Sequence, residues 1–209
     1  MVSRKDQIMS AVRQNAFGLA LLAIFIIVPL TMGRNADVHN MIIYILIYAI
    51  VGEGWNLISG FTGQTSFGHA AYFGIGAYTV GVLGNYYNIT PWVGMIVGAL
   101  IATAIAFLVN YKLFKRKGHY FAIATLAVCE ILRTVFSTWT YVGAGDGIKI
   151  IFRQENKGLW LDLDVSNRLP FLFITLAAFV VVFLVCRWLE NSKMGYYWKA
   201  IREGHEVAE

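Results

Sequence analysis

The stretch GFTGQTSFGHAAYFGIGAYTVG, residues 60–81, is apolar enough to lie in a membrane, yet it contains six glycines and several polar side chains. Each glycine in a helix interior costs about 1 kcal/mol relative to alanine. So many glycines indicate that backbones pass close together or that a helix is interrupted. Interrupted helices with polar groups at membrane depth are typical of solute paths, so the stretch predicts a broken membrane helix beside such a path.

The composition of the whole chain supports a membrane location. Of its 209 residues, 58% are hydrophobic and 14% are charged, against roughly 25% charged residues in soluble domains, and the mean hydropathy is +0.61. The apolar residues form runs close to the roughly 20 residues that a bilayer core demands. They predict an all-α, polytopic membrane protein with six transmembrane helices: 16–32, 40–58, 68–87, 92–111, His119–Thr138 and 170–189.

Lysine and arginine are distributed unequally between the two sides of these six spans. With the N-terminus inside, eleven fall in inner segments and five in outer ones. Short basic loops resist translocation, so both the N-terminus and the segment 190–209 are predicted to be cytoplasmic. The cluster KLFKRK at 112–117 lies between two spans, which favours a topology anchor over a nucleic-acid patch. The first run has no clear cleavage site after it, which favours a span over a signal peptide.

Three ionisable residues fall inside predicted spans. Glu53 lies near the inner end of its span, where it either reaches interfacial water or lines the solute path. Inserting Glu130 and Arg133 into the bilayer costs more free energy than the large apolar residues of the same span gain by insertion. Their spacing of three places them on one helix face, where opposite charges neutralise each other. That face is expected to turn to the bundle interior or to water, either as a structural ion pair or with a role in passage.

The glycine-rich stretch also has a purely structural interpretation. Ala70-x-x-x-Gly74 and Ala77-x-x-x-Gly81 are small-x-x-x-small patterns that permit close helix packing. These patterns do not explain residues 60–69. We predict that this stretch forms a non-helical or half-helical entry to the third span, whose free N–H groups and side chains line a cavity. His69 by itself is more typical of a packed, neutral histidine than of a ligand or a proton relay. The candidates for the translocation path are Glu53, Gln64, Thr65, Ser66 and His69.

The sequence offers no pattern for catalysis or for a metal. Cys129 and Cys186 lie in apolar spans and are interpreted as small buried hydrophobes, without a disulfide or metal framework. Paired carboxylates, histidine clusters and a nucleophile elbow do not occur at workable spacing. In the long outer loop, 139–169, GAGDG at 143–147 predicts a turn. The apolar residues at 148–152 and 159–163 are expected to pack on the rim; the loop either docks an external partner or is a plain surface loop.

Four blocks of this sequence resemble one known family. WNLISGFTGQTSFGHAAYFGIGAYTVGVL at 55–83 is similar to the signature region of the LivM-type permeases of branched-chain amino acid ABC transporters. RKGHYFAIATLAVCEILR at 116–133, GAGDGI at 143–148 and MGYYWKAIREGHEVAE at 194–209 follow in the order and spacing of that family's other blocks. The resemblance covers nearly all of the chain, and the blocks are specific as a set.

The resemblance implies a single permease domain over 1–209, in the inner membrane of a bacterium. Its expected partners are a second permease subunit, two cytoplasmic ATPases and an extracytoplasmic binding protein that delivers Leu, Ile, Val or similar solutes. The chain has no G-x-x-x-x-G-K-[ST] pattern, so ATP, the one cofactor expected, belongs to the partners. Within 190–209, the residues that look like the start of the coupling helix toward the ATPase are Lys199, Ala200, Ile201, Arg202, Glu203 and Gly204.

Other functions remain open at this point. Urea and short-amide permeases look alike at this level. An ion-coupled secondary transporter or channel would use the charges of Glu53, Glu130 and Arg133 and would need no ATPase, and a membrane-embedded enzyme is less favoured. Members of the resembling family continue through several further spans, so a truncated or partial product is expected.

Overall fold

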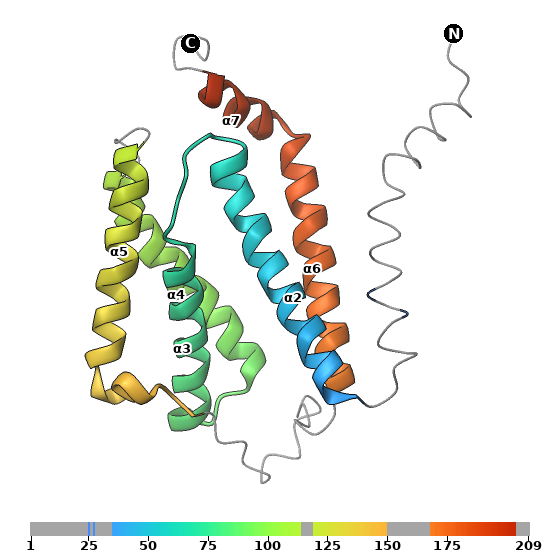
Figure 1. Ribbon diagram of the computed structural model, residues 1–209, viewed down its shortest axis with the longest axis vertical. Helices are drawn as coiled ribbons and strands as arrows, with labels where there is room; N and C mark the ends of the chain where they lie inside the picture. The colour runs from blue at the N-terminus through green and yellow to red at the C-terminus, as the bar shows by residue number, and fades with distance from the viewer. Residues whose placement is uncertain (1–24, 26, 28–34, 114–118, 150–167, 204–209) are drawn as a thin grey trace. The chain divides into compact units, whose positions relative to one another are not determined.

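The structure is a computed structural model, which describes residues 25, 27, 35–113, 119–149 and 168–203. Every regular element among these residues is a helix (Figure 1). The chain forms two compact units, 1–49 with 163–181 and 50–162 with 182–209. The α-helices are α2 (Ala36–Trp55), α3 (His69–Tyr87), α4 (Pro91–Leu113), α5 (His119–Thr138), α6 (Arg168–Glu190) and α7 (Lys193–Glu203).

Four of the described helical stretches are long and apolar enough to cross a membrane. They are Ala36–Gly60, Pro91–Tyr111, His119–Thr138 and Arg168–Glu190, and each overlaps a predicted span. The predicted span 68–87 forms helix α3, but its glycines and polar residues leave it outside this apolar set. The predicted span 16–32 lies almost wholly outside the described residues. The all-helical membrane class is therefore confirmed, whereas the count of six spans stays a prediction.

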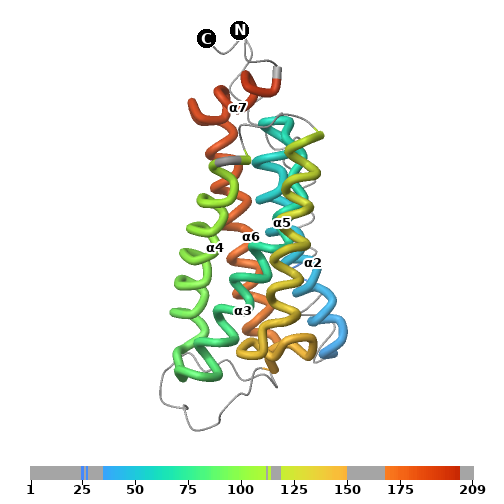
Figure 2. Tube along the Cα trace, turned by 90° about the vertical axis from the view of Figure 1, so that its left-hand side faces the viewer, coloured from blue at the N-terminus to red at the C-terminus, as the bar shows by residue number. Residues whose placement is uncertain are grey.

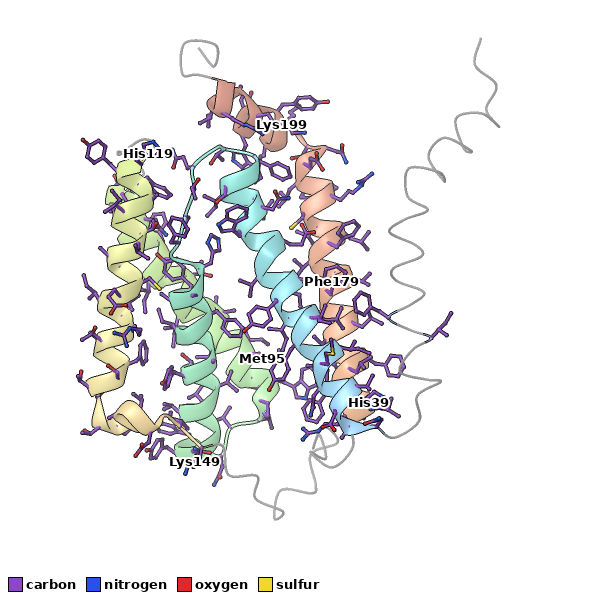
Figure 3. All side chains as sticks on the ribbon, viewed as in Figure 1. His39, Met95, His119, Lys149, Phe179 and Lys199 are labelled. Carbon is purple, nitrogen blue, oxygen red and sulfur yellow. The ribbon has the colours of Figure 1, made fainter. Side chains whose placement is uncertain are left out.

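The first unit is built on the N-terminal halves of α2 and α6. Leu46 and Leu172 are completely buried and form one cluster with Ile42 and Leu176. Half-buried side chains that include Phe25 and Phe179 pack against this cluster, and Figure 3 shows Phe179 on α6. All of these side chains are aliphatic or aromatic, so dispersion and shape hold this pair of helices together.

The second unit contains an antiparallel hairpin of α3 and α4. Asn88 ends α3 in the left-handed conformation, with φ +52°, and the next amide, of Ile89, donates to the Leu83 carbonyl at 3.1 Å. This is a common way to close a helix C-terminus. Pro91 then begins α4, where its fixed φ suits the first turn and its missing N–H is not needed. In Figures 1 and 2, α3, α4 and α5 run side by side.

Close packing in this hairpin depends on glycines other than the predicted ones. A Cβ added at Gly98 would lie 3.0 Å from the Gly76 carbonyl oxygen, and one at Gly94 would lie 3.4 Å from the Cα of Val80. Gly74, in contrast, has nothing within 4 Å. The prediction that Ala70-x-x-x-Gly74 permits close helix packing is therefore wrong for the described helices. Gly94-x-x-x-Gly98 on α4 allows the close contact instead.

The chain after α5 returns to the end of α3 through two single-turn 3-10 helices, η2 (Thr140–Val142) and η3 (Ala144–Asp146). Gly143 and Gly147 adopt φ of +85° and +68°, which confirms the predicted turn at GAGDG. Ile148 packs on Gly81 of α3 at 3.3 Å from the position of an added Cβ, as expected for the rim. The rest of the predicted apolar segments of this loop lies outside the described residues.

Helix α7 follows α6 after a two-residue bend. The Ser192 hydroxyl donates to the Leu189 carbonyl at 2.6 Å, and the Asn191 side-chain amide donates to the Arg187 carbonyl at 2.9 Å. A Cβ at the buried Gly195 would overlap the carbonyls of Leu189 and Glu190. The bend is therefore tight and requires glycine at that position.

Candidate functional site

The segment that joins α2 to α3 is the least regular part of the described membrane region. After Trp55 the chain continues as a π-helix, η1 (Asn56–Gly60), and residues 61–68 then form no regular helix. We call residues 61–68 the interrupted segment. Gly63 within it adopts φ +71°, a conformation that only glycine enters at little cost. This break agrees with the predicted non-helical entry to α3, and π-helical turns occur frequently at functional sites.

Side chains form hydrogen bonds with backbone N–H and C=O groups of the interrupted segment. The amide of Ser66 donates to the Ser59 hydroxyl at 3.2 Å, and the amide of Phe67 donates to the Thr125 hydroxyl of α5 at 3.1 Å. The Trp55 indole N–H donates to the Ser66 carbonyl at 2.9 Å. Ser66 and Thr125 are 4% and 2% exposed. Irregular backbone at membrane depth needs such internal partners, so the segment is held in a defined shape.

The other residues predicted for the solute path lie in or near the interrupted segment and differ in how exposed they are. Gln64 and His69 are half-buried, and Thr65 is exposed. The Gln64 Oε1 and His69 Nδ1 atoms are buried without a hydrogen-bond partner among the described residues. Glu53 is half-buried on α2, before the π-helix. The segment thus places several polar groups together, and two of them keep hydrogen-bonding capacity for a polar solute.

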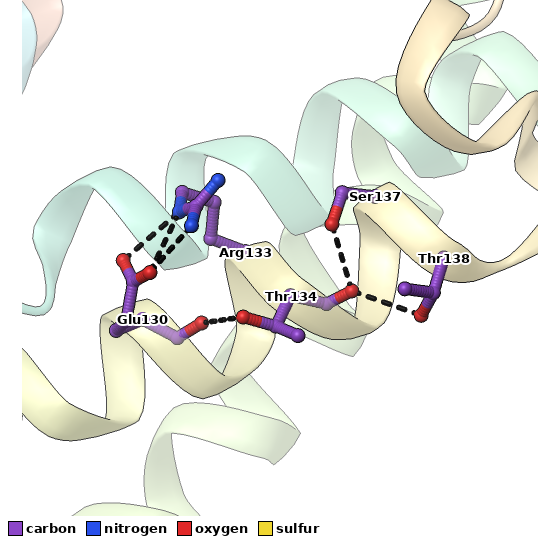
Figure 4. Close-up of polar contacts among 5 residues, drawn as sticks. All are labelled: Glu130, Arg133, Thr134, Ser137 and Thr138. Atoms are coloured by element: carbon purple, nitrogen blue, oxygen red, sulfur yellow. Dashed lines mark hydrogen bonds and ion pairs between the residues drawn. The ribbon is translucent and has the colours of Figure 1, made fainter.

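Helix α5 carries the most polar face among the described helices of membrane length (Figure 4). Arg133 Nε donates to both carboxylate oxygens of Glu130, at 3.0 and 2.9 Å. The hydroxyls of Thr134 and Ser137 donate to backbone carbonyls of α5, each at 2.9 Å. The side chains of Arg133 and Glu130 are 67% and 60% exposed. A shallow, open depression on this side is lined by Ala127, Glu130, Ile131, Thr134 and Val135.

The exposure of this pair has a physical consequence. Each charge has its counter-charge on the same helix face, so the pair is neutral as a whole. The other described helices leave most of it exposed, and the expectation that this face turns to the bundle interior or to water stays a prediction. Charged side chains are rare in lipid and face protein or water in membrane proteins, so this face of α5 suits a protein contact or a water-filled path.

The predicted coupling residues lie on α7, where Figure 3 shows Lys199. Arg202 Nη1 donates to the Gly60 carbonyl, at the end of the π-helix, at 3.1 Å. Lys199 Nζ lies 3.1 Å from Glu190 Oε1 and 5.7 Å from the centre of the Phe61 ring. Ala200 is half-buried and Ile201 exposed; Glu203 ends the helix, and Gly204 lies outside the described residues.

Sequence reasoning missed Thr125 and the acceptor role of Gly60. A threonine in a membrane helix usually donates to a carbonyl of the preceding turn, and Thr125 does so to Ala122 at 2.9 Å. Its hydroxyl oxygen thereby remains free to accept from Phe67. The polar side chain in an apolar span was the available signal, but only the fold pairs it with a segment 58 residues away.

Chemistry at a metal centre has no support in the described residues. No group of three or more His, Cys, Asp or Glu side chains among them could hold a metal ion. Cys129 is half-buried and Cys186 is buried, and both are free thiols.

Long apolar helices, with a hydrogen-bonded break between α2 and α3, indicate a polytopic membrane protein, and such interrupted helices are typical of transport proteins. The family described as the permease component of branched-chain amino acid transport systems matches residues 38–209. Two curated relatives, both high-affinity branched-chain amino acid transport system permease proteins LivM, come from Salmonella typhimurium and Escherichia coli. Each is 31% identical over 215 residues, which cover 93% of this chain and 50% of the relative.

This chain therefore belongs to the family of branched-chain amino acid transport permease components. It spans about half the length of the curated relatives that it matches. No solved structure matches it.

Proposed function

We propose that this chain contributes a transmembrane permease subunit to an ATP-driven ABC importer of branched-chain or related hydrophobic amino acids. Its residues 1–209 form one permease domain with six spans in a bacterial inner membrane, with both ends cytoplasmic. Family membership over residues 38–209 supports the class. The basic residues support the orientation, since short cytoplasmic loops are enriched in lysine and arginine.

The observation that carries the proposal is the position of the interrupted segment. It presents polar groups between two membrane helices, and it is hydrogen-bonded to α5 at one end. At its other end, the Gly60 carbonyl just before it accepts from Arg202 of α7. Transporters place their solute sites at interrupted helices within the membrane, and an ATP-driven importer must in addition connect that site to its ATPase. The interrupted segment suits both requirements.

The energy source in this proposal lies on partners. We assign ATP hydrolysis to two cytoplasmic ATPases, solute delivery to an extracytoplasmic binding protein, and the other half of the path to a second permease subunit. The segment 190–209, with α7, is the surface toward the ATPase. The neutralised Glu130–Arg133 pair leaves no unbalanced charge at that position for ion coupling, so an ion-coupled carrier or channel would have to rely on Glu53.

The test is uptake by the chain co-expressed with candidate ATPases, an extracytoplasmic binding protein and a sister permease of a branched-chain amino acid importer. Radiolabelled leucine, isoleucine, valine and urea are compared as solutes. We expect uptake of the amino acids to stop on ATP depletion and to survive collapse of the ion gradients. Uptake that depends on the ion gradient and not on ATP would show that the protein is an ion-coupled carrier. Uptake of urea alone would show that the proposed substrate class is wrong.

A pair of variants locates the solute path. Gln64→Ala removes a half-buried amide next to the break, and we expect a raised KM for the solute. Ile96→Ala is the matched control, because Ile96 is 64% exposed on α4 and its truncation removes only apolar surface. Equal kinetics for both variants would exclude Gln64 from the path.

A further inference from the structure

Helix α7 contacts its own chain at the point where α2 breaks. The Arg202 guanidinium donates to the Gly60 carbonyl at 3.1 Å, across 142 residues of sequence. Lys199, one turn earlier on α7, lies 5.7 Å from the centre of the Phe61 ring and is paired with Glu190 at the end of α6. Both basic side chains of this turn are therefore directed to the start of the interrupted segment and its surroundings.

The backbone at this point is shaped for the contact. The carbonyl of Gly60 ends the π-helix, so no further helical turn requires it as an acceptor. A Cβ at Gly60 would meet the Asn56 side chain, which can rotate away, whereas a Cβ at Gly63 would lie 3.1 Å from Cγ of Arg202. Gly63 also has φ +71°. Gly63 therefore permits both the break and the close approach of the α7 side chain.

The far end of the interrupted segment is anchored on a different helix. Phe67 donates its amide to Thr125 of α5 at 3.1 Å, and Gly68 donates its amide to the Ser66 hydroxyl at 3.3 Å. Thr125 is 2% exposed. Farther along the same helix comes Glu130, the acidic member of the polar face. Hydrogen bonds and one short segment thus connect α7 to the helix that carries this face.

We propose that Arg202 is a positioning residue, which holds the interrupted segment against α7 and passes displacements of α7 to Thr125 and helix α5. A guanidinium on a backbone carbonyl is a charge-assisted hydrogen bond, which is stronger and more directional than a neutral one. The direction of the signal, from an ATPase under α7 toward the solute, rests on the proposed function. The contact itself and its effect on the segment do not.

This assignment changes the role expected for Arg202. From the sequence, the residue belongs to a surface that fits into the groove of an ATPase. In the structure its Nη1 donates to the Gly60 carbonyl of the same chain, while the residue stays exposed. Loss of Arg202 is then expected to loosen the interrupted segment, while the outer surface of α7 keeps its shape for a partner.

Hydrogen–deuterium exchange of the full chain in lipid nanodiscs tests the contact without transport. In Arg202→Met we expect amides of 61–68 to exchange roughly fivefold faster, the change produced by losing one net hydrogen bond. Arg202→Lys keeps a donor and should restore most of the protection. Lys193→Met is the matched control, since Lys193 is an exposed cation at the start of the same helix, and it should leave the segment unchanged.

The outcomes separate this proposal from the proposed function. Unchanged exchange of 61–68 in Arg202→Met, or equal acceleration in Lys193→Met, would overturn the positioning role whatever the protein transports. Faster exchange in Arg202→Met with rescue by lysine supports it. In the assembled importer, the same variant should then lower solute transported per ATP hydrolysed while ATPase co-purification stays normal. If ATPase co-purification falls as much as transport does, Arg202 contacts the ATPase directly and the positioning role is wrong.

Discussion

The contact between α3 and α4 makes a quantitative prediction for Gly98→Ala. The added methyl group would lie 3.0 Å from the Gly76 carbonyl oxygen and 3.4 Å from the Gly76 Cα. Both neighbours are backbone atoms, so the two helices must separate by a few tenths of an ångström. Such overpacking costs about 1–3 kcal/mol. Replacing glycine by alanine in a helix interior returns about 1 kcal/mol.

A matched control isolates the packing effect. Gly74→Ala, on α3 of the same hairpin, places its methyl group where nothing lies within 4 Å. This variant gains the same stabilisation from the higher helix propensity of alanine, but it has no steric clash. The difference in the free energy of unfolding between the two variants should therefore equal the packing term, about 1–3 kcal/mol, with Gly98→Ala the less stable.

The measurement is reversible unfolding in detergent micelles, followed by circular dichroism during titration with a denaturing detergent. A difference of about 1.4 kcal/mol corresponds to a tenfold change in the unfolding equilibrium constant, which such titrations resolve. Gly98→Ala as stable as Gly74→Ala would refute the close approach of the two helices at this point. It would also remove Gly94-x-x-x-Gly98 as the packing motif.

Three further outcomes are expected. Glu130→Gln alone should lower the amount of protein in the membrane, because it leaves Arg133 without its counter-charge, and adding Arg133→Gln should recover part of the loss on quantitative blots; strictly additive losses would mean that the pair does not interact. Single cysteines at Lys115 and Lys157, in a background without native cysteines, should label from the inside and the outside respectively, and labelling of position 115 by an impermeant reagent in intact cells would reverse the orientation. Thr125→Val should lower the free energy of unfolding by about 1 kcal/mol more than Thr125→Ser, which keeps the hydroxyl; equal stability would show that this hydrogen bond does not contribute.

Several features of this protein follow from the sequence because they depend on local properties of the chain. A run of about 20 apolar residues must form a membrane helix, since lipid offers its backbone no other partner. The concentration of glycine and polar residues at 60–69 likewise predicts a break, because these residues disfavour a continuous helix. The spacing of Glu130 and Arg133 places both on one helix face, because residues three apart are neighbours on the surface of any α-helix.

The helices' mutual contacts depend on how each one is rotated and where it crosses its neighbours. Gly74 and Gly98 both belong to helical glycine-rich patterns, yet only Gly98 faces another backbone. The sequence presents Arg202 as a cytoplasmic charge available to a partner, whereas in the fold its Nη1 also donates to a carbonyl 142 residues away. Hydrophobicity and propensity act along the chain, while steric fit and hydrogen-bond geometry act between segments distant in sequence. The sequence alone therefore determined the membrane class, the break and the family, and only the tertiary structure decided which glycines pack and which side chains hold the break in place.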